Sequence, residues 1–558
     1  MKISMRLFVI AAMCAAARAG AQATVTPGDS ILRSMAAHSI DRVSLALRDG
    51  DFANLAVTHG KGLAVSVVKP TGNFVESFVE PDMEGTNPVA FVAEGSGQYA
   101  LVVRNDGDAP VQYSVAFRER TSLDDRTRPV APRDEVVSPR IESIRRQVES
   151  GNTNTGMFWD AVSKEGTPLF EPLDARYELL TFLWRAAGDT RNVYVAASLE
   201  LPGPPHKELH RLGTTDIWYL TLKVPKGARF TYGLEPNRPS DEDADRITRQ
   251  MDPLNRGMKW ECPAGASKFT CRSVGESPQA EPQQWIAKRQ EIATGKLQTS
   301  RIHSALQNLD RDLTIYTPAG YEPKGKPYPL VVLFDGDQYV EPEWGGVNTW
   351  DNMIAARRIP ATVVVMVHNV SGRRLFDLVV NPTFADFVAK ELTPWMRSHY
   401  NVSRDRNNVV IGGSSAGGLA ATYVGLTHPE AFGNVLSMSG AFWWSPEHNG
   451  GVCGGRCASP ASRPVVRNRD ATTEPNWIAN LVLKRPPAAR PRVYLGVGTF
   501  EFDSDGTGGG ILEETRHLRD LLVARNYQVI FRQFVGGHDN VIWRGELGDG
   551  LQSLLGSN

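Results

Sequence analysis

The sequence predicts a multidomain protein, with two N-terminal β-sandwich domains followed by an α/β domain that is built on a mostly parallel sheet. Two observations support this prediction. Short alternations of polar and apolar residues, separated by turn residues, fill the first half of the chain and are typical of β-sandwiches. After about residue 299, continuous apolar runs alternate with amphipathic stretches, which indicates parallel strands with helices on both faces. A chain of 558 residues is long enough for three or four such domains.

Changes of composition along the chain place the domain boundaries. A stretch rich in charge and proline, residues 121–140, predicts a linker between the two β-rich regions. We expect a signal peptide in residues 1–23, a β jelly-roll in 24–120, the linker in 121–160, a second β-sandwich in 161–298 and the α/β domain in 299–558.

Composition and charge exclude several classes of protein. Hydrophobic residues make up 41% of the chain and charged residues 22%, as in ordinary globular proteins and unlike disordered chains. The 61 Lys and Arg residues nearly balance the 62 Asp and Glu residues, for a net charge of −1. No overall basic field would therefore attract nucleic acid. Beyond the N-terminus there is no run of about 18 apolar residues, so we expect no integral membrane segment in the mature chain.

The N-terminal residues have the pattern of a secretory signal peptide. Lys2 and Arg6 precede an apolar run, and residues 19–21 (Ala-Gly-Ala) or 21–23 (Ala-Gln-Ala) offer a cleavage site. We therefore expect the mature protein to be periplasmic or secreted.

Four of the five cysteines lie beyond this segment, and an even number in an oxidising compartment predicts disulfides. The spacing offers the local pairs Cys262–Cys271 and Cys453–Cys457, although four cysteines allow three pairings. Because neither pair has histidines at a helpful spacing, the sequence predicts no metal site there.

The most informative motif is Gly-Gly-Ser-Ser-Ala-Gly-Gly at residues 412–418, which stands between a strand-like run and a helix-like run. A Gly-x-Ser-x-Gly sequence in this context is a nucleophile elbow, in which a sharp turn exposes the serine oxygen above the sheet. The frame makes Ser415 the candidate nucleophile, since Gly413 and Gly417 flank it at the required spacing. The alternative is a glycine-rich helix N-terminus that binds an anion.

A serine nucleophile needs a base and an acid, which follow it along the chain in this architecture. His538 lies in a glycine turn directly after the last apolar run, and we expect it to be the base. The acid should follow the preceding strand, where Glu501, Asp503 and Asp505 compete. Spacing alone does not choose between these three carboxylates.

Acyl transfer also needs N–H groups that point at the developing oxyanion. We expect one to be the backbone N–H of Ala416, directly after the nucleophile. The other should come from the loop after residues 330–334, where we assign the N–H of Asp337.

Two regions of the chain resemble known families. Residues 97–99 (Gly-Gln-Tyr) and 113–115 (Tyr-Ser-Val) resemble strands of the pre-peptidase C-terminal-type jelly-roll domains of secreted bacterial enzymes. From about residue 299, the chain resembles the esterase D-like α/β-hydrolases, and most of all the enterochelin (ferric enterobactin) esterase family. This resemblance rests on residues 334–336 (Phe-Asp-Gly), the Ser415 elbow, 437–444 (Ser-Met-Ser-Gly-Ala-Phe-Trp-Trp) and 536–539 (Gly-Gly-His-Asp).

Upstream, residues 181–185, 215–218 and 252–255 resemble that family's N-terminal β-sandwich. In the family a Gly-x-x-Glu sequence precedes the helix before the catalytic histidine, and residues 498–501 match it. The resemblance therefore favours Glu501 as the acid, with Asp503 as the alternative, and it also implies Asp337 as an oxyanion donor.

The resemblance implies a serine esterase that hydrolyses a catecholate trilactone siderophore, free or ferric, through an acyl-enzyme. The N-terminal pattern adds the expectation that this esterase is secreted, whereas the best-known members of the family are cytoplasmic. The resemblance implies no metal or organic cofactor, because any iron would arrive with the substrate. Two alternatives stay open: a feruloyl or acetyl esterase that acts on plant polysaccharide, and a binding protein built on a degenerate hydrolase. The apparently complete triad argues against the second alternative.

Five residues are candidates for substrate binding. Adjacent tryptophans cannot both face the core of a regular element, so we expect at least one of Trp443 and Trp444 to line the cleft and stack on aromatic groups. Arg373, Arg374 and Arg544 are candidates to face an anionic substrate such as a ferric catecholate.

Overall fold

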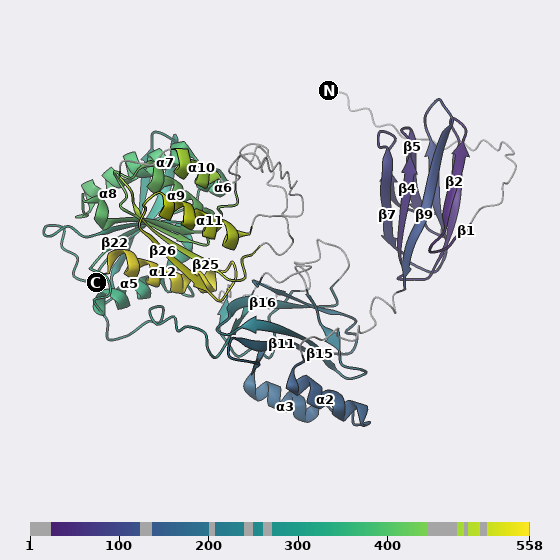
Figure 1. The fold of residues 1–558 in the computed structure, drawn as a ribbon, viewed down its shortest axis with the longest axis horizontal. Helices are drawn as coiled ribbons and strands as arrows, with labels where there is room; N and C mark the ends of the chain where they lie inside the picture. The colour runs from purple at the N-terminus through teal and green to yellow at the C-terminus, as the bar shows by residue number, and fades with distance from the viewer. Residues whose placement is uncertain are drawn as a thin grey trace. The chain divides into compact units, whose positions relative to one another are not determined.

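The computed structural model describes residues 24–122, 137–199, 207–238, 249–260, 271–444, 477–484, 489–502 and 510–556 (Figure 1). The chain divides into two compact units, Met1–Pro129 and Val130–Asn558. The predicted signal peptide lies outside the described residues, as do Cys262, Cys453, Cys457, Asp503 and Asp505.

The first unit is a pair of β-sheets around one hydrophobic core. Its strands alternate buried and exposed residues, as β8 shows, because each sheet has one face on the core and one on solvent. The five-stranded sheet has the order β1-β3-β8-β5-β6, and the four-stranded sheet has the order β2-β9-β4-β7. The strands are β1 (Thr24–Val25), β2 (Ser30–Met35), β3 (Ile40–Leu47), β4 (Phe52–His59), β5 (Leu63–Val68), β6 (Phe74–Val79), β7 (Gly85–Val92), β8 (Gly97–Asn105) and β9 (Val111–Thr121).

Part of the predicted linker is helical. Residues 121–160 contain α2 (Pro139–Glu149) and the start of α3 (Gly156–Glu165), so the linker prediction is wrong over this stretch. Ser138 caps α2 by accepting a hydrogen bond from the backbone N–H of Ile141, and Pro139 is well suited to the first helical position. The prediction misjudged the segment because the charged residues of α2 alternate with apolar ones that are buried in a small core with α3.

The next domain of the second unit is a β-sandwich with one four-stranded and one five-stranded sheet, of orders β10-β11-β15-β14 and β13-β12-β16-β18-β17. Phe182, Phe230 and Tyr232 fill the space between the sheets, with ring centroids 5.2–6.0 Å apart. The strands are β10 (Leu169–Pro172), β11 (Tyr177–Arg185), β12 (Val193–Ala197), β13 (Lys207–Glu208), β14 (His210–Arg211), β15 (Ile217–Pro225), β16 (Arg229–Pro236), β17 (Lys259–Trp260) and β18 (Arg272–Glu276).

The last domain confirms the predicted mostly parallel sheet. Its eight strands have the order β19-β20-β22-β21-β23-β24-β25-β26; the pairs β19–β20 and β20–β22 are antiparallel and all later pairs are parallel. The strands are β19 (Lys296–Ser304), β20 (Leu309–Thr317), β21 (Leu330–Phe334), β22 (Val363–Val367), β23 (Val409–Ser414), β24 (Asn434–Met438), β25 (Arg492–Gly498) and β26 (Val529–Phe534).

Helices cover both faces of this sheet, which explains why its strands are continuous apolar runs. Val332 and Ile411 are buried on one face with residues of α9 and α11, while Val331 and Val410 are buried on the other face with residues of α5 and α12. The helices are η2 (Gly336–Val340), α5 (Gly346–Ala355), α6 (Arg374–Leu378), α7 (Pro382–Asp386), η3 (Phe387–Leu392), α8 (Thr393–His399), η4 (Arg406–Asn408), α9 (Ala416–Thr427), α10 (Trp477–Lys484), α11 (Ile511–Ala524) and α12 (Asn540–Leu555).

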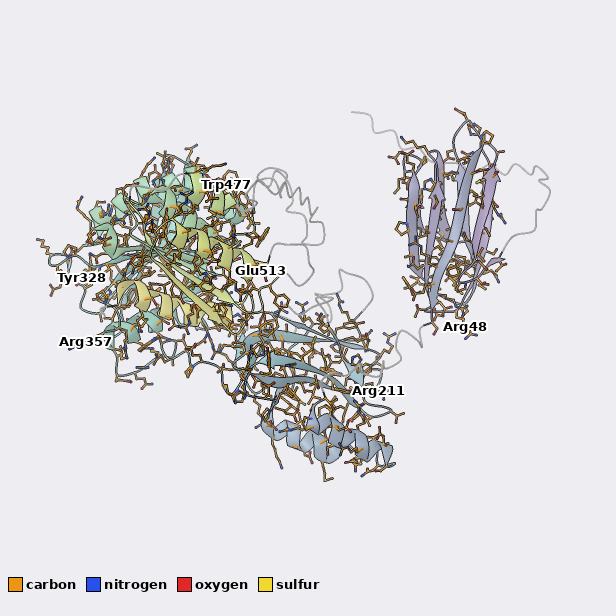
Figure 2. All side chains as sticks on the ribbon, viewed as in Figure 1. Arg48, Arg211, Tyr328, Arg357, Trp477 and Glu513 are labelled. Atoms are coloured by element: carbon orange, nitrogen blue, oxygen red, sulfur yellow. The ribbon has the colours of Figure 1, made fainter. Side chains whose placement is uncertain are left out.

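The outside of each unit carries charge. Arg48 of the first unit and Arg357 of the second are exposed and lie at the periphery of their units (Figure 2). Among the residues that the structure describes, no helix combines the length and the apolar character that a membrane crossing requires.

Candidate active site

Ser415 stands at the turn between β23 and α9, in a backbone conformation that few non-glycine residues adopt, with φ 56° and ψ −123°. A Cβ atom on Gly413 would lie 2.7 Å from the backbone carbonyl carbon of Gly417, so the turn has no room for a side chain there. Two backbone hydrogen bonds hold the turn: the N–H of Ser415 donates to Met438, and the N–H of Ala441 donates to the carbonyl oxygen of Ser415. This is the geometry of a nucleophile elbow.

The structure brings Ser415, His538 and Glu501 together from three different loops at one edge of the sheet. His538 Nε2 lies 2.8 Å from Ser415 Oγ, and His538 Nδ1 lies 2.6 Å from Glu501 Oε1. Both distances are within hydrogen-bonding range. The Glu501 side chain is fully buried, and His538 remains partly exposed.

The second oxygen of Glu501 also has partners. Oε2 accepts hydrogen bonds from the backbone N–H of Gly498 at 2.6 Å and from the Ser439 hydroxyl at 2.8 Å. The Trp543 indole N–H in turn donates to Ser439 Oγ at 2.9 Å, and the Trp543 ring meets the His538 ring edge-on at a centroid distance of 4.7 Å.

Sequence reasoning did not identify Ser439 or Trp543 as site residues. Ser439 lies within residues 437–444, one of the motifs on which the family resemblance rests, and Trp543 lies shortly after the motif at residues 536–539. Their contacts with Glu501 and His538 depend on how separate loops fold together, so the sequence carried no direct signal for them.

The two expected oxyanion donors both lie in the first turn of a helix, where backbone N–H groups have no acceptor within the helix. Ala416 begins α9, and Asp337 is the second residue of η2. A Cβ on Gly336 would lie 2.7 Å from the backbone of Met366, so this loop runs close against β22. The Asp337 carboxylate itself lies 2.5 Å from Nδ1 of His368.

Arg374 braces the same loop. Its guanidinium donates two hydrogen bonds to the Asp335 carboxylate, at 2.6 and 2.8 Å, and Asn369 donates a third at 2.7 Å. Asp335 itself adopts a left-handed conformation, with φ 57°, directly before η2. The pKa of Arg374 is raised, chiefly by its hydrogen bonds to Asp335. Arg374 is therefore engaged with the loop, and we do not assign it to the substrate.

The other two candidate arginines differ in exposure. The Arg373 side chain is 35% exposed, lies over the Phe376 ring and is 3.4 Å from Asp377. Arg544 is only 5% exposed; it donates to Gln283 and to the backbone carbonyl of Glu343, and it lies over the Trp260 ring. Burial and the positive charge of Arg229 lower the pKa of Arg544 to about 10. Because these contacts occupy Arg544, we do not assign it to the substrate.

The two tryptophans also differ in burial. Trp444 is 6% exposed and belongs to the hydrophobic core on the α9 side of the sheet, whereas Trp443 is half-buried against that core. Trp443 is thus the member of the pair that keeps a face near solvent, and Trp444 is a core residue.

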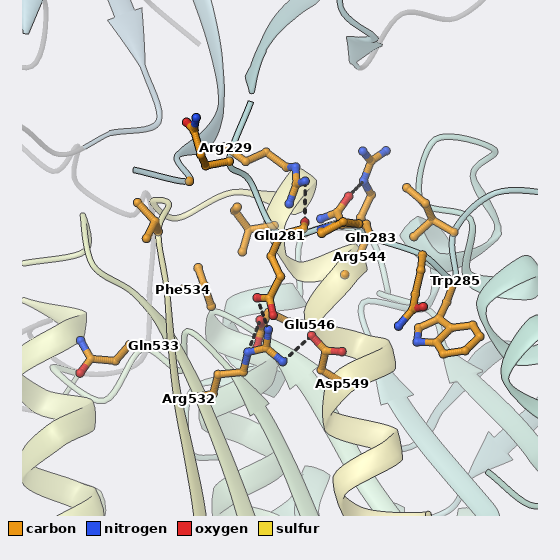
Figure 3. Close-up of a pocket in the computed structure, with 18 of the residues that line it drawn as sticks. Arg229, Glu281, Gln283, Trp285, Arg532, Gln533, Phe534, Arg544, Glu546 and Asp549 are labelled. Carbon is orange, nitrogen blue, oxygen red and sulfur yellow. Dashed lines mark hydrogen bonds and ion pairs between the residues drawn. The ribbon is translucent and has the colours of Figure 1, made fainter. Parts of the chain in front are cut away.

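A separate cavity of about 420 Å³ lies between the β-sandwich and α12. Figure 3 shows Arg532 directed at Glu281, Glu546 and Asp549, with Arg229 and Arg544 on the opposite side. Ser415, His538 and Glu501 do not line it. We call it the α12 pocket.

Of the four cysteines predicted to form disulfides, only Cys271 lies within the described residues, where it is buried next to β18. The pairings Cys262–Cys271 and Cys453–Cys457 stay predictions.

Comparisons with known proteins identify relatives over most of the second unit. The Esterase family model matches residues 304–554, and the model described as enterochelin esterase, N-terminal, matches residues 179–286. The chain is 29% identical over 436 residues to an iron(III) enterobactin esterase of Dickeya dadantii, and the match covers 71% of this chain and 92% of the relative. It is 27% identical over 434 residues to an iron(III) salmochelin esterase of Escherichia coli O6:H1, and this match covers 75% of this chain and 98% of the relative.

Solved structures share the fold. An enterobactin esterase from Shigella flexneri, determined in the presence of enterobactin, has 23% sequence identity and a TM-score of 0.54 over 72% of this chain and 97% of its own. A ferric enterobactin esterase from Salmonella typhimurium has 24% identity and a TM-score of 0.54 over 71% of this chain and 98% of its own. The family models and the sequence relatives together show that the chain is an enterochelin esterase-like protein and a carboxylic-ester hydrolase.

Proposed function

We propose that the protein is a serine esterase that hydrolyses the ester bonds of a catecholate trilactone siderophore, such as enterobactin or its ferric complex, through an acyl-enzyme. The observation that carries the proposal is the hydrogen-bonded series Ser415–His538–Glu501 at the elbow after β23. The class of substrate comes from the names of the relatives, which are esterases of iron(III) enterobactin and iron(III) salmochelin.

In this proposal, His538 Nε2 takes the proton of the Ser415 hydroxyl as the serine oxygen attacks an ester carbonyl. Glu501 holds the imidazole in the tautomer that leaves Nε2 free to act as the base, and it stabilises the imidazolium that forms. The backbone N–H groups of Ala416 and Asp337 stabilise the oxyanion, each by about 3 kcal/mol of the activation barrier.

The imidazolium then gives its proton to the departing alcohol, so that the first bond cleavage opens the lactone ring and leaves an ester of Ser415. A water molecule that His538 deprotonates attacks this ester and releases the acid. Repetition on the linear product would yield shorter acids.

Arg373 and Trp443 support an anionic, aromatic substrate. Arg373 is the N-terminal neighbour of α6, which packs against the nucleophile helix α9, and its guanidinium is partly exposed. A ferric tris-catecholate is anionic and presents aromatic rings, so a cation and a partly exposed indole are suitable contacts. We therefore propose these two residues, of the five that the sequence offered, as the substrate contacts.

The test uses purified protein from residue 24 onward and its Ser415→Ala variant, incubated with ferric enterobactin and with methyl ferulate. We expect the wild-type protein to release the linear trimer, dimer and monomer in turn, as followed by mass spectrometry. The variant should be slower by about 10⁴-fold or more, because the nucleophile is absent. Equal turnover by the variant would contradict the mechanism.

The carbohydrate-esterase alternative has narrower support. The chain is 25% identical to an acetyl esterase of Caldicellulosiruptor saccharolyticus, over 167 residues and only 29% of this chain. Release of ferulate, with the trilactone left intact, would move the assignment to that class.

We also propose that residues 1–23 direct export and that the four later cysteines form disulfides. The proposal rests on the sequence pattern alone. Mass spectrometry of protein recovered from the periplasm would test both points, since cleavage after residue 21 or 23 and the loss of two hydrogens per disulfide are measurable. An uncleaved chain with all five cysteines as free thiols would contradict them.

A further inference from the structure

The β-sandwich of the second unit contacts the residue that directly follows His538. Oδ2 of Asp539 accepts hydrogen bonds from the Ser198 hydroxyl, from the Thr231 hydroxyl at 2.6 Å and from the Thr231 backbone N–H at 2.8 Å. Ser198 follows β12, and Thr231 lies in β16. Oδ1 of Asp539 accepts from the N–H of Val541 and thereby caps α12. One buried carboxylate therefore joins the sandwich, the histidine loop and the following helix.

The backbones of the two domains also meet at this point. The N–H of Arg229 donates to the carbonyl oxygen of Val535 at 3.1 Å, and Arg229 forms a parallel bridge with Gly536. A Cβ on Gly537 would fall 1.6 Å from the carbonyl oxygen of Ser198. The glycines before His538 thus allow the sandwich backbone to approach closely, which a side chain at either position would prevent.

The loop that carries Glu501 is anchored in the same way. Phe500 is buried in the hydrophobic core of the sandwich, together with Phe182 and Phe230, and Phe502 packs against that core. The N–H of Phe500 also donates to the carbonyl oxygen of Gly536 at 3.0 Å, so the two loops are joined to each other. Both partners of Ser415 are therefore held from the sandwich side.

We propose that this β-sandwich is a positioning element of the active site, and that Ser198 and Thr231 are positioning residues that hold His538 in place through Asp539. The inference rests on the proposed role of His538 as the base. Its physical basis is that proton transfer needs the imidazole within hydrogen-bonding reach of Ser415, and that small displacements of a reacting group greatly reduce rate. Neither side chain would touch the substrate.

The test compares Thr231→Val, which removes the hydroxyl donor at nearly constant volume, with Thr231→Ser, which keeps it. We expect Thr231→Val to lower kcat on the order of tenfold with KM unchanged. Thr231→Ser should restore kcat to within about twofold. Ser198→Ala, which removes the other hydroxyl, should act like Thr231→Val.

The matched control is Thr221→Val. Thr221 lies in β15, in the other sheet of the same sandwich, where its hydroxyl is hydrogen-bonded to that of Thr181 at 3.0 Å. The control should leave kcat unchanged. Equal losses of kcat in Thr231→Val and Thr221→Val would overturn the inference, because they would reflect general destabilisation, and so would a wild-type kcat in Thr231→Val.

The rate at which a fluorophosphonate reagent labels Ser415 is a second readout that needs no natural substrate. We expect Thr231→Val to be labelled on the order of tenfold more slowly than the wild type. Labelling of both at the same rate would overturn the positioning role while leaving the esterase proposal intact. A wild-type protein that is not labelled at all would overturn the serine nucleophile itself, and the inference with it.

Discussion

At the scale of single residues, the Glu501 carboxylate shows how a buried charge is stabilised beside the candidate nucleophile. A fully buried carboxylate is costly unless it is hydrogen-bonded. Here it meets the His538 ring, the backbone N–H of Gly498 and the Ser439 hydroxyl. These contacts fix the position of the carboxylate, so that it is placed to orient the imidazole and to stabilise an imidazolium.

Glu501→Gln should therefore abolish most activity while leaving substrate binding largely intact. An amide can present its N–H to His538 and so favour the wrong tautomer of the ring. We expect kcat to fall by about 10³- to 10⁴-fold, to be measured by steady-state kinetics. Asp503→Asn is the matched control and should retain kcat within about twofold. A large loss in Asp503→Asn, with little in Glu501→Gln, would make Asp503 the acid.

Ser439→Ala should reduce both stability and activity. The change leaves the buried Trp543 indole N–H without its acceptor and removes one donor from Glu501. We expect a loss of about 1–3 kcal/mol in the free energy of unfolding, measured by urea denaturation, together with a lower kcat.

The control for this variant is Ser437→Ala. Ser437 is also a buried serine of the same segment, but its hydroxyl forms no hydrogen bond with the residues that the structure describes. Its removal should change neither property appreciably. Equal effects of the two substitutions would argue against the Ser439 hydrogen bonds as the cause.

At the scale of elements, a network of charged side chains joins β26 and α12, and Glu546 is its buried member. Arg532 of β26 forms ion pairs with Glu281 and with Asp549 of α12 (Figure 3). Tyr494 donates a hydrogen bond to Glu546 at 2.6 Å. Burial raises the pKa of Glu546 to about 7, against an ordinary value of 4.5. The pKa of Asp549 is also raised by burial.

This raised pKa predicts a pH-dependent stability. The folded protein holds the Glu546 proton between pH 4.5 and about 7, whereas the unfolded chain has lost it, so the free energy of unfolding should decline as pH rises through this window. The contribution is at most about 3 kcal/mol. Glu546→Gln should reduce the difference in unfolding free energy between pH 5 and pH 8, measured by urea denaturation, by up to this amount.

Glu281→Gln serves as the control, because Glu281 contacts the same arginine but its side chain is 76% exposed. It should keep most of the pH dependence of the wild type, because the charge of Glu281 is the smallest of the causes that raise the pKa of Glu546. An unchanged difference between pH 5 and pH 8 in Glu546→Gln would show that Glu546 does not titrate in this window.

At the scale of the whole molecule, the first unit is a compact unit with its own sheets. It has a hydrophobic core of its own, and the contacts described for Ser415, His538 and Glu501 all come from the second unit. A chain that begins at residue 130 should therefore keep kcat/KM within about twofold of the full mature chain, measured on the same ester. A tenfold loss would show that the first unit contributes to catalysis or binding.

Local sequence patterns predicted this structure correctly where the environment of a single strand or helix determines which residues are apolar. Residues 330–334 are apolar throughout because both faces of their strand are covered, and this is visible in the sequence. The same approach failed for residues 139–149, which the predicted linker of residues 121–160 includes, because the buried side of α2 is narrow. It also could not separate Trp443 from Trp444, since the backbone path after β24 decides which ring enters the core.

The sequence by itself determined the mostly parallel sheet, the elbow frame around Ser415 and the histidine turn, because each of these depends on neighbours along the chain. Only the tertiary structure decided which carboxylate reaches His538, since Glu501 lies 37 residues away and meets it where two loops join. Only the tertiary structure, likewise, linked Ser198 to Asp539 across 341 residues. Such contacts depend on how distant segments pack, and no local pattern of residues encodes that packing.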